Sequence, residues 1–308
     1  MDASTSRPLR TLVTGASGYI GQQLVRRLLA AGWDVHVLMR AKADRTLPWP
    51  AGGRVDVHVH DGSTASIAAL VGESRPDVVF HLASLFLAQH QPGDAAALVE
   101  SNVLFPTQLV EAMAAHDVRH LVNTGTSWQH HHDADYLPVN LYAATKQAFE
   151  DVLAYYCDAH GLRVKTLALF DTYGPGDSRK KLIPLLWQAA ASGVPLQLSP
   201  GEQRLDMVHI GDVIDAFVLA ARQLSAQGAM HARHGVSSGR TLTLRELVAA
   251  FERATGEQVP VVWGGRPYRP REVMVPWSRS EPLPGWTARI AFEDGVAQTR
   301  PRPDGSPA

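Results

Sequence analysis

Three glycines spaced three residues apart constrain the fold of this chain more than any other feature. Gly15, Gly18 and Gly21 directly follow an apolar segment, residues 11–14, and precede residues 19–30, whose apolar side chains recur at helical spacing. The sequence therefore predicts a buried strand, a tight turn and a helix in immediate succession. Glycine suits such a turn because it allows sharp bends and close approach of another group to the backbone.

Further apolar segments of strand length alternate with segments of helical periodicity. They extend over Thr11–Thr14, Val35–Met39, Val55–His60, Val78–Ala83, Leu121–Thr124 and Val164–Phe170. Strands that alternate with helices in this way form parallel sheets with helices on both faces. The predicted fold class is therefore α/β, a doubly wound parallel sheet of the Rossmann type.

The distribution of proline predicts a second, smaller domain, because prolines become frequent after Tyr173. Pro, Gly and Ser dominate the last residues, which are expected to be disordered. The expected division is a first domain over residues 1–173 with 205–225 returning to it, a smaller, interleaved substrate domain over 174–204 and 226–299, and a disordered tail over 300–308.

Composition excludes several classes of protein. The 308 residues carry 29 basic and 30 acidic side chains, a net charge of −1, and 45% of them are hydrophobic. This balance is typical of globular proteins and lacks the basic field of nucleic-acid binders. No apolar run approaches the ~18 residues of a membrane span and the first residues lack a signal-peptide core, so we expect a cytoplasmic protein. The single cysteine, Cys157, is expected to be a buried, inert thiol.

The glycine turn also predicts a ligand. A glycine-rich helix N-terminus offers free N–H groups and a positive dipole end to a pyrophosphate, so we expect a dinucleotide there. The second strand ends at Arg40, where proteins that prefer NAD(H) usually carry an acidic residue for the ribose hydroxyl. Arg40, with Lys42 and Arg45 nearby, favours NADP(H). NAD(H) is the alternative, with Arg40 merely solvated.

Tyr142 and Lys146 are four residues apart at the start of a predicted helix, so both side chains project from one face. A cation beside a phenol lowers the pKa of the phenol, which lets tyrosine exchange a proton with an alcohol or carbonyl oxygen near neutral pH. The other interpretation is an exposed helix pair without chemistry. The place of the pair after a glycine turn, in a chain with only five lysines, favours chemistry.

These features belong to a wider set of motifs. The chain contains Gly15-Ala-Ser-Gly-Tyr-Ile-Gly21, His81-Leu-Ala83, Asn102, Tyr142-x-x-x-Lys146, Phe170-Asp-Thr-Tyr-Gly-Pro-Gly-Asp177 and Gly211-Asp-Val. Together they resemble the extended short-chain dehydrogenase/reductase family over residues 9–295. Members with this layout act mostly on nucleotide-activated sugars as epimerases, dehydratases or reductases, and a homodimer is common among them. The resemblance therefore implies an enzyme whose substrate is a nucleoside-diphosphate sugar.

The resemblance also implies a role for each matching position. Tyr142 would be the catalytic acid/base residue, Lys146 would hold the nicotinamide ribose and tune Tyr142, and Thr126 would hydrogen-bond the reacting oxygen. Thr124 and Ser127 are possible substitutes for Thr126, and Asn102 matches a mainly structural helix residue. The implied cofactor-binding residues are Gly15, Ser17, Gly18, Tyr19, Ile20, Gly21, Arg40, Asp61 at the adenine, Leu82, Ala83, Tyr142 and Lys146. The implied substrate-binding residues are Thr126, Ser127, Trp128, Arg204, Arg269 and Arg271.

Departures from the family pattern narrow the reaction. The sugar dehydratases of the family carry Asp-Glu after the catalytic threonine, whereas this chain has Ser127-Trp128, so dehydration is disfavoured. The motifs most resemble the nucleotide-linked 4-keto-6-deoxyhexose reductases, and a reductase consumes NADPH. The alternatives are a nucleotide-sugar epimerase with tightly bound NAD and a non-catalytic dinucleotide-sensing protein.

Two departures affect the expected substrate site. Leu205 stands where the family commonly has arginine, and Asp171 stands where it usually has asparagine. Binding of the diphosphate is therefore expected to pass to Arg204, Arg269 or Arg271, and a solvated surface position is an equal alternative for each.

The run His130-His131-His132 is interpreted as a polar loop that borders the substrate. Consecutive residues seldom point at one centre, and zinc sites usually use spaced ligands, so no metal is expected there.

Overall fold

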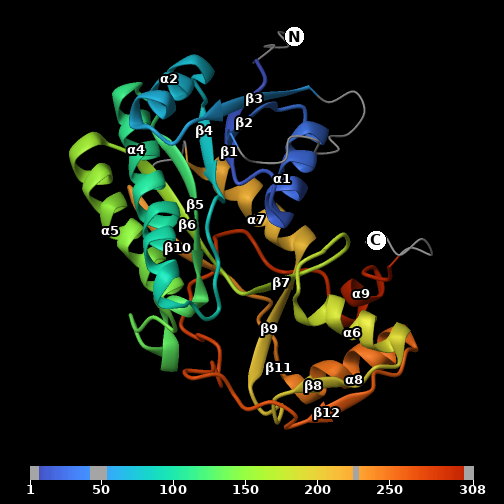
Figure 1. Ribbon diagram of the computed structural model, residues 1–308. Helices are drawn as coiled ribbons and strands as arrows, with labels where there is room; N and C mark the ends of the chain where they lie inside the picture. The colour runs from blue at the N-terminus through green and yellow to red at the C-terminus, as the bar shows by residue number, and fades with distance from the viewer. Residues whose placement is uncertain (1–6, 42–53, 225–228, 302–308) are drawn as a thin grey trace. The chain divides into compact units, whose positions relative to one another are not determined.

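The computed structural model describes residues 7–41, 54–224 and 229–301 (Figure 1). Within these residues, the sheet with the most strands has seven, in the order β10-β6-β5-β4-β1-β2-β3. Its strands are β1 (Arg10–Thr14), β2 (Asp34–Arg40), β3 (Val55–His60), β4 (Val78–His81), β5 (His120–Thr126), β6 (Arg163–Leu169) and β10 (His231–Val236). The pairs β1–β2, β1–β4, β2–β3 and β4–β5 are parallel. The predicted doubly wound α/β fold is confirmed.

The chain divides into two compact units. The first comprises Met1–Thr124, Thr145–Leu167 and Phe217–Arg233, and the second comprises Gly125–Ala144, Ala168–Ala216 and His234–Ala308. This division differs from the predicted boundary after residue 173, and only the later part of 205–225 returns to the first unit. The difference arises because the chain changes unit inside strands and helices, such as β5 and β6, and not in proline-rich loops.

Helices pack on the sheet of the first unit. Their bounds are α1 (Tyr19–Ala30), α2 (Thr64–Ser74), α3 (Ala95–Val99) and α4 (Phe105–Ala115), with a short 3₁₀ turn at Pro92–Asp94 and a π turn at Glu100–Leu104. Helices α5 (Leu141–His160) and α7 (Ile210–Gln223) begin in the second unit and continue into the first. The 3₁₀ turns at Ser127–Gln129 and His131–Asp133 belong to the second unit. Figure 1 shows α2, α4 and α5 along one face of the sheet.

One apolar cluster joins these three helices to the sheet. It includes Ile67 of α2, Leu109 of α4 and Leu153 of α5, all fully buried. Burying a side chain of this size contributes about 1.5–3 kcal/mol relative to leaving it exposed. Cys157 belongs to the same cluster and is 4% exposed, and burial raises the pKa of its thiol to about 11. The thiol is therefore buried and protonated near neutral pH, as predicted.

The second unit has its own sheets and core. Its elements are β7 (Asp171–Tyr173), α6 (Leu182–Ser192), β8 (Leu196–Leu198), β9 (Arg204–His209), β11 (Thr241–Thr243), α8 (Leu244–Thr255), β12 (Val261–Trp263) and α9 (Phe292–Ala297). Strands β11, β9 and β7 form one sheet, and β12 and β8 form another. The core packs around large side chains that include Trp187, Phe251 and Phe292.

The predicted disordered tail, residues 300–308, includes a residue that makes ordered contacts, Arg300. Arg300 forms an ion pair of 2.8 Å with Glu257 and lies over the ring of Trp187, 5.0 Å from its centroid. Residues 302–308 lie outside the described residues. No helix in the described part of the chain is long and apolar enough to cross a membrane.

Candidate functional site

The glycine turn joins β1 to α1 and leaves the helix N-terminus open. Gly18 is the N-cap residue of α1, and no side chain caps the helix. The amide of Gly18 donates to the carbonyl of Gly15 at 3.0 Å, which closes the turn. The first N–H groups of α1, at Tyr19, Ile20 and Gly21, therefore have no side-chain cap and suit an anionic ligand.

Two of the three glycines are required by close contacts. Gly15 has a φ of +71°, and a Cβ there would lie 2.5 Å from the amide nitrogen of Ala83. A Cβ on Gly21 would lie 2.2 Å from the carbonyl oxygen of Gly15. Both distances are below van der Waals contact, so only glycine permits this turn. This cradle and the uncapped helix fit a dinucleotide pyrophosphate.

A cavity of about 410 Å³ opens beside this turn in the first unit. It lies at the carboxyl ends of parallel strands, where open α/β sheets bind ligands. The sequence-predicted residues that line it are Gly15, Ser17, Gly18, Arg40, Leu82 and Ala83. The lining residues that the sequence analysis missed are Ala16, Leu38, Met39, His60, Gly62, Ser84, Leu85, Ala97, Glu100, Ser101, Leu104, Phe105 and Gln108.

Two titratable side chains, Arg40 and His60, stand at the carboxyl ends of β2 and β3, and they differ in exposure to solvent. Arg40, at the end of β2, is exposed and lines the cavity. His60, at the end of β3, is buried, and burial together with Arg40 lowers the pKa of its imidazole. Arg40 is therefore the cation at this end of the cavity among the described lining residues. Lys42 and Arg45, the expected helpers of Arg40, lie outside the described residues.

Asp61 lies in the turn between β3 and α2. Its carboxylate accepts a hydrogen bond of 2.8 Å from the amide of Ser63, the N-cap residue of α2, and this bond lowers the pKa of the carboxyl group. Its neighbours His60 and Gly62 line the cavity, whereas Asp61 does not. The contact of Asp61 with an adenine stays a prediction.

Asn102 stabilises the loop that follows β4. It lies in the π turn, and its side-chain oxygen accepts hydrogen bonds from the amide of Leu85 at 2.8 Å and from the hydroxyl of Ser84 at 3.0 Å. Its side-chain nitrogen donates to the carbonyl of Leu85 and to the hydroxyl of Thr145, both at 3.0 Å. Ser84 and Leu85 line the cavity, so the structural role expected for Asn102 is confirmed.

Helix α5 carries Tyr142 and Lys146 one turn apart. The helix begins after Asn140, whose side chain accepts a hydrogen bond of 2.9 Å from the amide of Ala143. Tyr142 is partly exposed, whereas Lys146 is only 1% exposed. Burial lowers the pKa of the Lys146 ammonium to about 8, and the nearby carboxylate of Glu150 opposes this shift. Lys146 therefore stays mostly protonated at neutral pH.

Glu150 lies one further turn along α5 and is buried as well. Its carboxylate accepts hydrogen bonds from Arg233, one of them at 2.8 Å from Nε, and Arg233 also donates to the side chain of Gln147 at 2.9 Å. Glu150 and Arg233 thus form an ion pair one turn from Lys146, and the charge of Glu150 opposes the lowering of the pKa of Lys146. The sequence analysis missed Glu150.

Replacing Lys146 with methionine is expected to stabilise the folded chain at pH 7 by up to about 3 kcal/mol, because it removes an ammonium whose pKa burial lowers from 10.5 to about 8. The advantage should shrink as pH rises from about 8 toward 10.5. In that window the folded wild type releases a proton that the unfolded chain keeps, so the stability of the wild type rises. Urea unfolding at pH 7 and pH 9.5 measures both effects.

Lys180→Met is the matched control, because Lys180 is exposed. Its stability should follow that of the wild type at both values of pH. A Lys146→Met variant that is less stable than the wild type at pH 7 contradicts the expectation.

In the second unit, Thr126 ends β5 and caps the 3₁₀ turn that follows. Its hydroxyl accepts a hydrogen bond of 3.3 Å from the amide of Trp128, and its own amide donates to the side chain of Gln129 at 3.0 Å. The guanidinium of Arg269 lies 5.5 Å from the centroid of the Trp128 ring. The structure thus brings four of the predicted substrate-binding residues, Thr126, Ser127, Trp128 and Arg269, into one neighbourhood.

The three candidate arginines differ in what they contact. Arg204 donates to the carbonyl of Thr241 at 2.7 Å, and Arg271 donates to the carbonyls of Pro138 at 2.8 Å and Val139 at 3.0 Å. All three guanidinium groups are engaged by the chain itself, because Arg269 donates to both carboxylate oxygens of Glu272, at 3.1 and 2.6 Å. Arg269 differs from the other two in lying over the ring of Trp128. Its place beside Trp128 makes it the anion-binding candidate nearest to Thr126 among the three.

Asp171, Lys181 and Arg269 form a group of interacting charges that the sequence analysis did not predict. Burial raises the pKa of the Asp171 carboxyl group, and the charges of Lys181 and Arg269 oppose this shift. Lys181 is the N-cap residue of α6, and burial lowers the pKa of its ammonium. Asp171 was noticed only as a departure from the family, and Lys181 lies in a loop without a motif.

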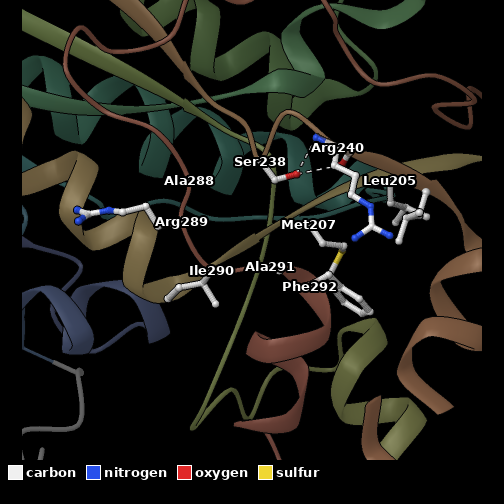
Figure 2. Close-up of a pocket in the computed structure, with 10 residues that line it drawn as sticks. Leu205, Met207, Ser238, Arg240, Ala288, Arg289, Ile290, Ala291 and Phe292 are labelled. Atoms are coloured by element: carbon white, nitrogen blue, oxygen red, sulfur yellow. Dashed lines mark hydrogen bonds between the residues drawn. The ribbon is translucent and has the colours of Figure 1, made fainter. Parts of the chain in front are cut away.

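A second cavity, of about 240 Å³, lies within the second unit (Figure 2). Leu205 and Met207 project into it from β9, and Phe292, Ile290 and Arg240 complete its wall. The carboxylate of Asp206, between the first two, instead accepts hydrogen bonds from the amide and hydroxyl of Ser238. Leu205 therefore gives an apolar wall where the family commonly has arginine.

The histidine run bends through two 3₁₀ turns. The ring of His130 stacks on Trp277 with centroids 3.7 Å apart. The Nε2 atom of His131 lies 3.4 Å from the carbonyl oxygen of Glu272, and His132 has a φ of +55°. The rings of His131 and His132 lie against each other, with centroids 3.8 Å apart, whereas His130 packs on Trp277.

The sheet, the glycine turn and the Tyr142/Lys146 pair define a dinucleotide-dependent enzyme. The chain belongs to the NAD dependent epimerase/dehydratase family, whose model matches residues 11–232. This membership confirms the resemblance to the extended short-chain dehydrogenases/reductases that the sequence indicated.

Individual relatives are similar over nearly their whole length. A UDP-glucose 4-epimerase of Mycolicibacterium smegmatis is 29% identical, with 94% of this chain and 97% of the relative covered. A CDP-abequose synthase of Salmonella typhimurium is 23% identical, covering 93% and 96%. The crystal structure of the Thermus thermophilus UDP-glucose 4-epimerase in complex with NAD is 26% identical and superposes with a TM-score of 0.80, covering 95% and 98%.

Proposed function

We propose that the protein reduces the 4-keto group of a nucleoside-diphosphate-linked 4-keto-6-deoxy sugar with NADPH. The observation that carries the choice of NADPH is Arg40, an exposed cation at the end of β2 that lines the dinucleotide cavity. A guanidinium suits a 2′-phosphate, whereas a ribose hydroxyl calls for a carboxylate at this position. The choice of reaction is supported by the similarity to CDP-abequose synthase, which is a reductase of 4-keto-6-deoxy sugars.

In the proposed reaction, each residue of the site has a separate role. NADPH, when bound, supplies a hydride to the keto carbon. Tyr142 donates a proton to the developing alkoxide oxygen, and the hydroxyl of Thr126 donates a hydrogen bond to the same oxygen. Lys146, protonated at neutral pH, favours the phenolate of Tyr142 once the proton has left. Arg269 and Trp128 bind the nucleoside diphosphate. The homodimer and the cytoplasmic location stay predictions.

The second candidate is a nucleotide-sugar epimerase with tightly bound NAD. It is favoured by the similarity to UDP-glucose 4-epimerases, one of which was crystallised with NAD. An epimerase uses the same tyrosine and lysine, first to remove and then to return a proton, with no net consumption of the dinucleotide. The two candidates therefore differ in cofactor turnover and share their catalytic residues.

An NADPH-oxidation assay against a panel of nucleotide-linked 4-keto-6-deoxy sugars tests the proposal. We expect stoichiometric oxidation with at least one member, and NMR of the product gives the configuration of the new hydroxyl. An absence of oxidation with every member, combined with dinucleotide retained through purification and interconversion of UDP-glucose and its C4 epimer, would establish the epimerase instead.

Replacing Arg40 with glutamine is expected to lower kcat/KM for NADPH by about 10- to 100-fold, the effect of losing one charge-assisted hydrogen bond of roughly 1.5–3 kcal/mol. The value for NADH should change little, because NADH lacks the 2′-phosphate. Arg27→Gln, an exposed arginine of α1 outside the cavity lining, is the control. An equal loss with both dinucleotides contradicts the assignment of Arg40.

A further inference from the structure

A cluster of titratable side chains lies on the edge of the first unit's sheet, away from the cavity lining. Asp34 and His36 are two residues apart on β2, and Asp56 and His58 are two residues apart on β3. His36 is the register partner of Asp56 in this parallel pair. Since side chains two residues apart point to the same face, all four lie together on one face of the two strands.

The imidazole of His36 is the centre of this cluster. His36 is only 8% exposed, and its Nδ1 atom makes a hydrogen bond of 2.8 Å with Nε2 of His58. Its Nε2 atom is inaccessible to solvent and has no hydrogen-bond partner. This atom lies 3.5 Å from Oδ1 of Asp34 and 3.9 Å from Oδ2 of Asp56. When Nδ1 donates to His58, the lone pair of Nε2 faces two carboxylates, an arrangement that a cation between them would stabilise.

Two arginines orient the carboxylates. Nε of Arg10 donates to Oδ2 of Asp34 at 2.7 Å, and Nε of Arg54 donates to Oδ1 of Asp56 at 3.0 Å. Each arginine thus binds the oxygen that faces away from His36 and leaves the other oxygen toward it. Hydrogen-bonded ligands of this kind, including the His58 contact to the second ring nitrogen, are typical of the surroundings of protein metal sites.

We propose that Asp34, His36 and Asp56 bind a divalent transition metal, with Zn²⁺ the best match. Their ligand atoms lie within 4.8 Å of one another. Two ligands at the usual zinc distances of about 2.0–2.2 Å are roughly 3.4 Å apart across a tetrahedral centre, close to the observed 3.5 Å. Asp34 and Asp56 are 35% and 33% exposed, so the ion can enter from solvent and keep a water as fourth ligand.

The site would connect the edge strand β3 to β2, so its expected effect is on stability. Because a ligand that binds only the folded chain raises the unfolding temperature, zinc should stabilise the protein. The competing explanation is a protonated His36 that pairs with the two carboxylates, with Arg10, Arg54, His58 and Glu73 as the other nearby charges. That explanation needs no metal.

Isothermal titration of the chelator-treated full chain with Zn²⁺ at pH 7 tests the proposal. We expect one site per chain whose affinity falls at least about tenfold in His36→Gln and in Asp56→Asn, as for the loss of a ligand. Asp56→Asn preserves side-chain shape and keeps the test valid if His36→Gln folds poorly. His116→Gln, an exposed histidine of the same unit, is the control and should bind as the wild type does.

Thermal unfolding gives an independent readout. Zinc should raise the unfolding temperature of the wild type and of His116→Gln, and it should have a smaller effect on Asp56→Asn. The proposal is overturned if the wild type binds no zinc, if binding persists unchanged in both site variants, which would point to the histidine run at 130–132, or if NMR shows His36 protonated at pH 7 with zinc present.

Discussion

Tyr142→Phe lowers kcat by about 10²- to 10⁴-fold, the usual effect of removing a general acid, and leaves the affinity for the dinucleotide nearly unchanged. The phenyl ring keeps the volume and packing of the side chain on α5, and only the proton that the hydroxyl exchanges is lost. The expected effect therefore falls on turnover and not on binding. Steady-state kinetics with the active nucleotide sugar and titration of the dinucleotide by fluorescence measure the two quantities separately.

Tyr155→Phe is the matched control for this variant. Tyr155 lies on the same helix and is 59% exposed, so its hydroxyl is in solvent. Its turnover should equal that of the wild type. Near wild-type turnover in Tyr142→Phe, in a reductase or an epimerase assay, would refute the acid/base role of Tyr142.

Gly21→Ala is expected to weaken dinucleotide binding by at least about tenfold and to destabilise the fold by about 1–3 kcal/mol, the usual cost of overpacking. Alanine favours a helix over glycine by roughly 0.5–1 kcal/mol. In α1, however, the new Cβ would lie 2.2 Å from the carbonyl oxygen of Gly15 and 2.8 Å from Cα of Ala16. Because both neighbours are backbone atoms, the turn itself must move, and the contact outweighs the gain in propensity.

Gly93→Ala supplies the comparison. No heavy atom lies within 4 Å of a Cβ at Gly93, and its φ is not in the left-handed region. Its binding and stability should match those of the wild type. The two variants are compared by dinucleotide titration and urea unfolding, and an unchanged affinity in Gly21→Ala would exclude this turn as the pyrophosphate site.

Six of the seven strands of the central sheet could be predicted from the sequence, because apolar residues dominate β1, β2 and β4 and alternate with polar ones in β3. Strand β10, with the sequence His-Ala-Arg-His-Gly-Val, has no such pattern and was missed. The predicted strand over Val55–His60 has the same bounds as β3, and Thr11–Thr14 differs from β1 by one residue. The boundaries of the two units could not be predicted, because they fall within regular elements. Helix α5, for example, has unbroken helical periodicity, yet it contributes to both units.

The candidate site was predictable where a motif carries the chemistry. The glycines and Arg40 line the cavity as expected, since their positions relative to a strand end are fixed. Glu100, Ser101 and Leu104 of the π turn were not predictable, because an extra residue in a helical turn leaves no pattern in the sequence. Asp61 accepts the amide of Ser63 in a turn, and an aspartate that forms such a turn after a strand looks the same in sequence as a ligand-binding one.

The burial of Lys146 has a consequence for directed evolution of this protein. A selection that scores only heat resistance would enrich apolar substitutions at position 146, since removing the buried ammonium favours the folded chain. The selected proteins would be folded, abundant and inactive. A library intended to yield a robust catalyst therefore has to hold Lys146 constant or to screen for turnover in the same round.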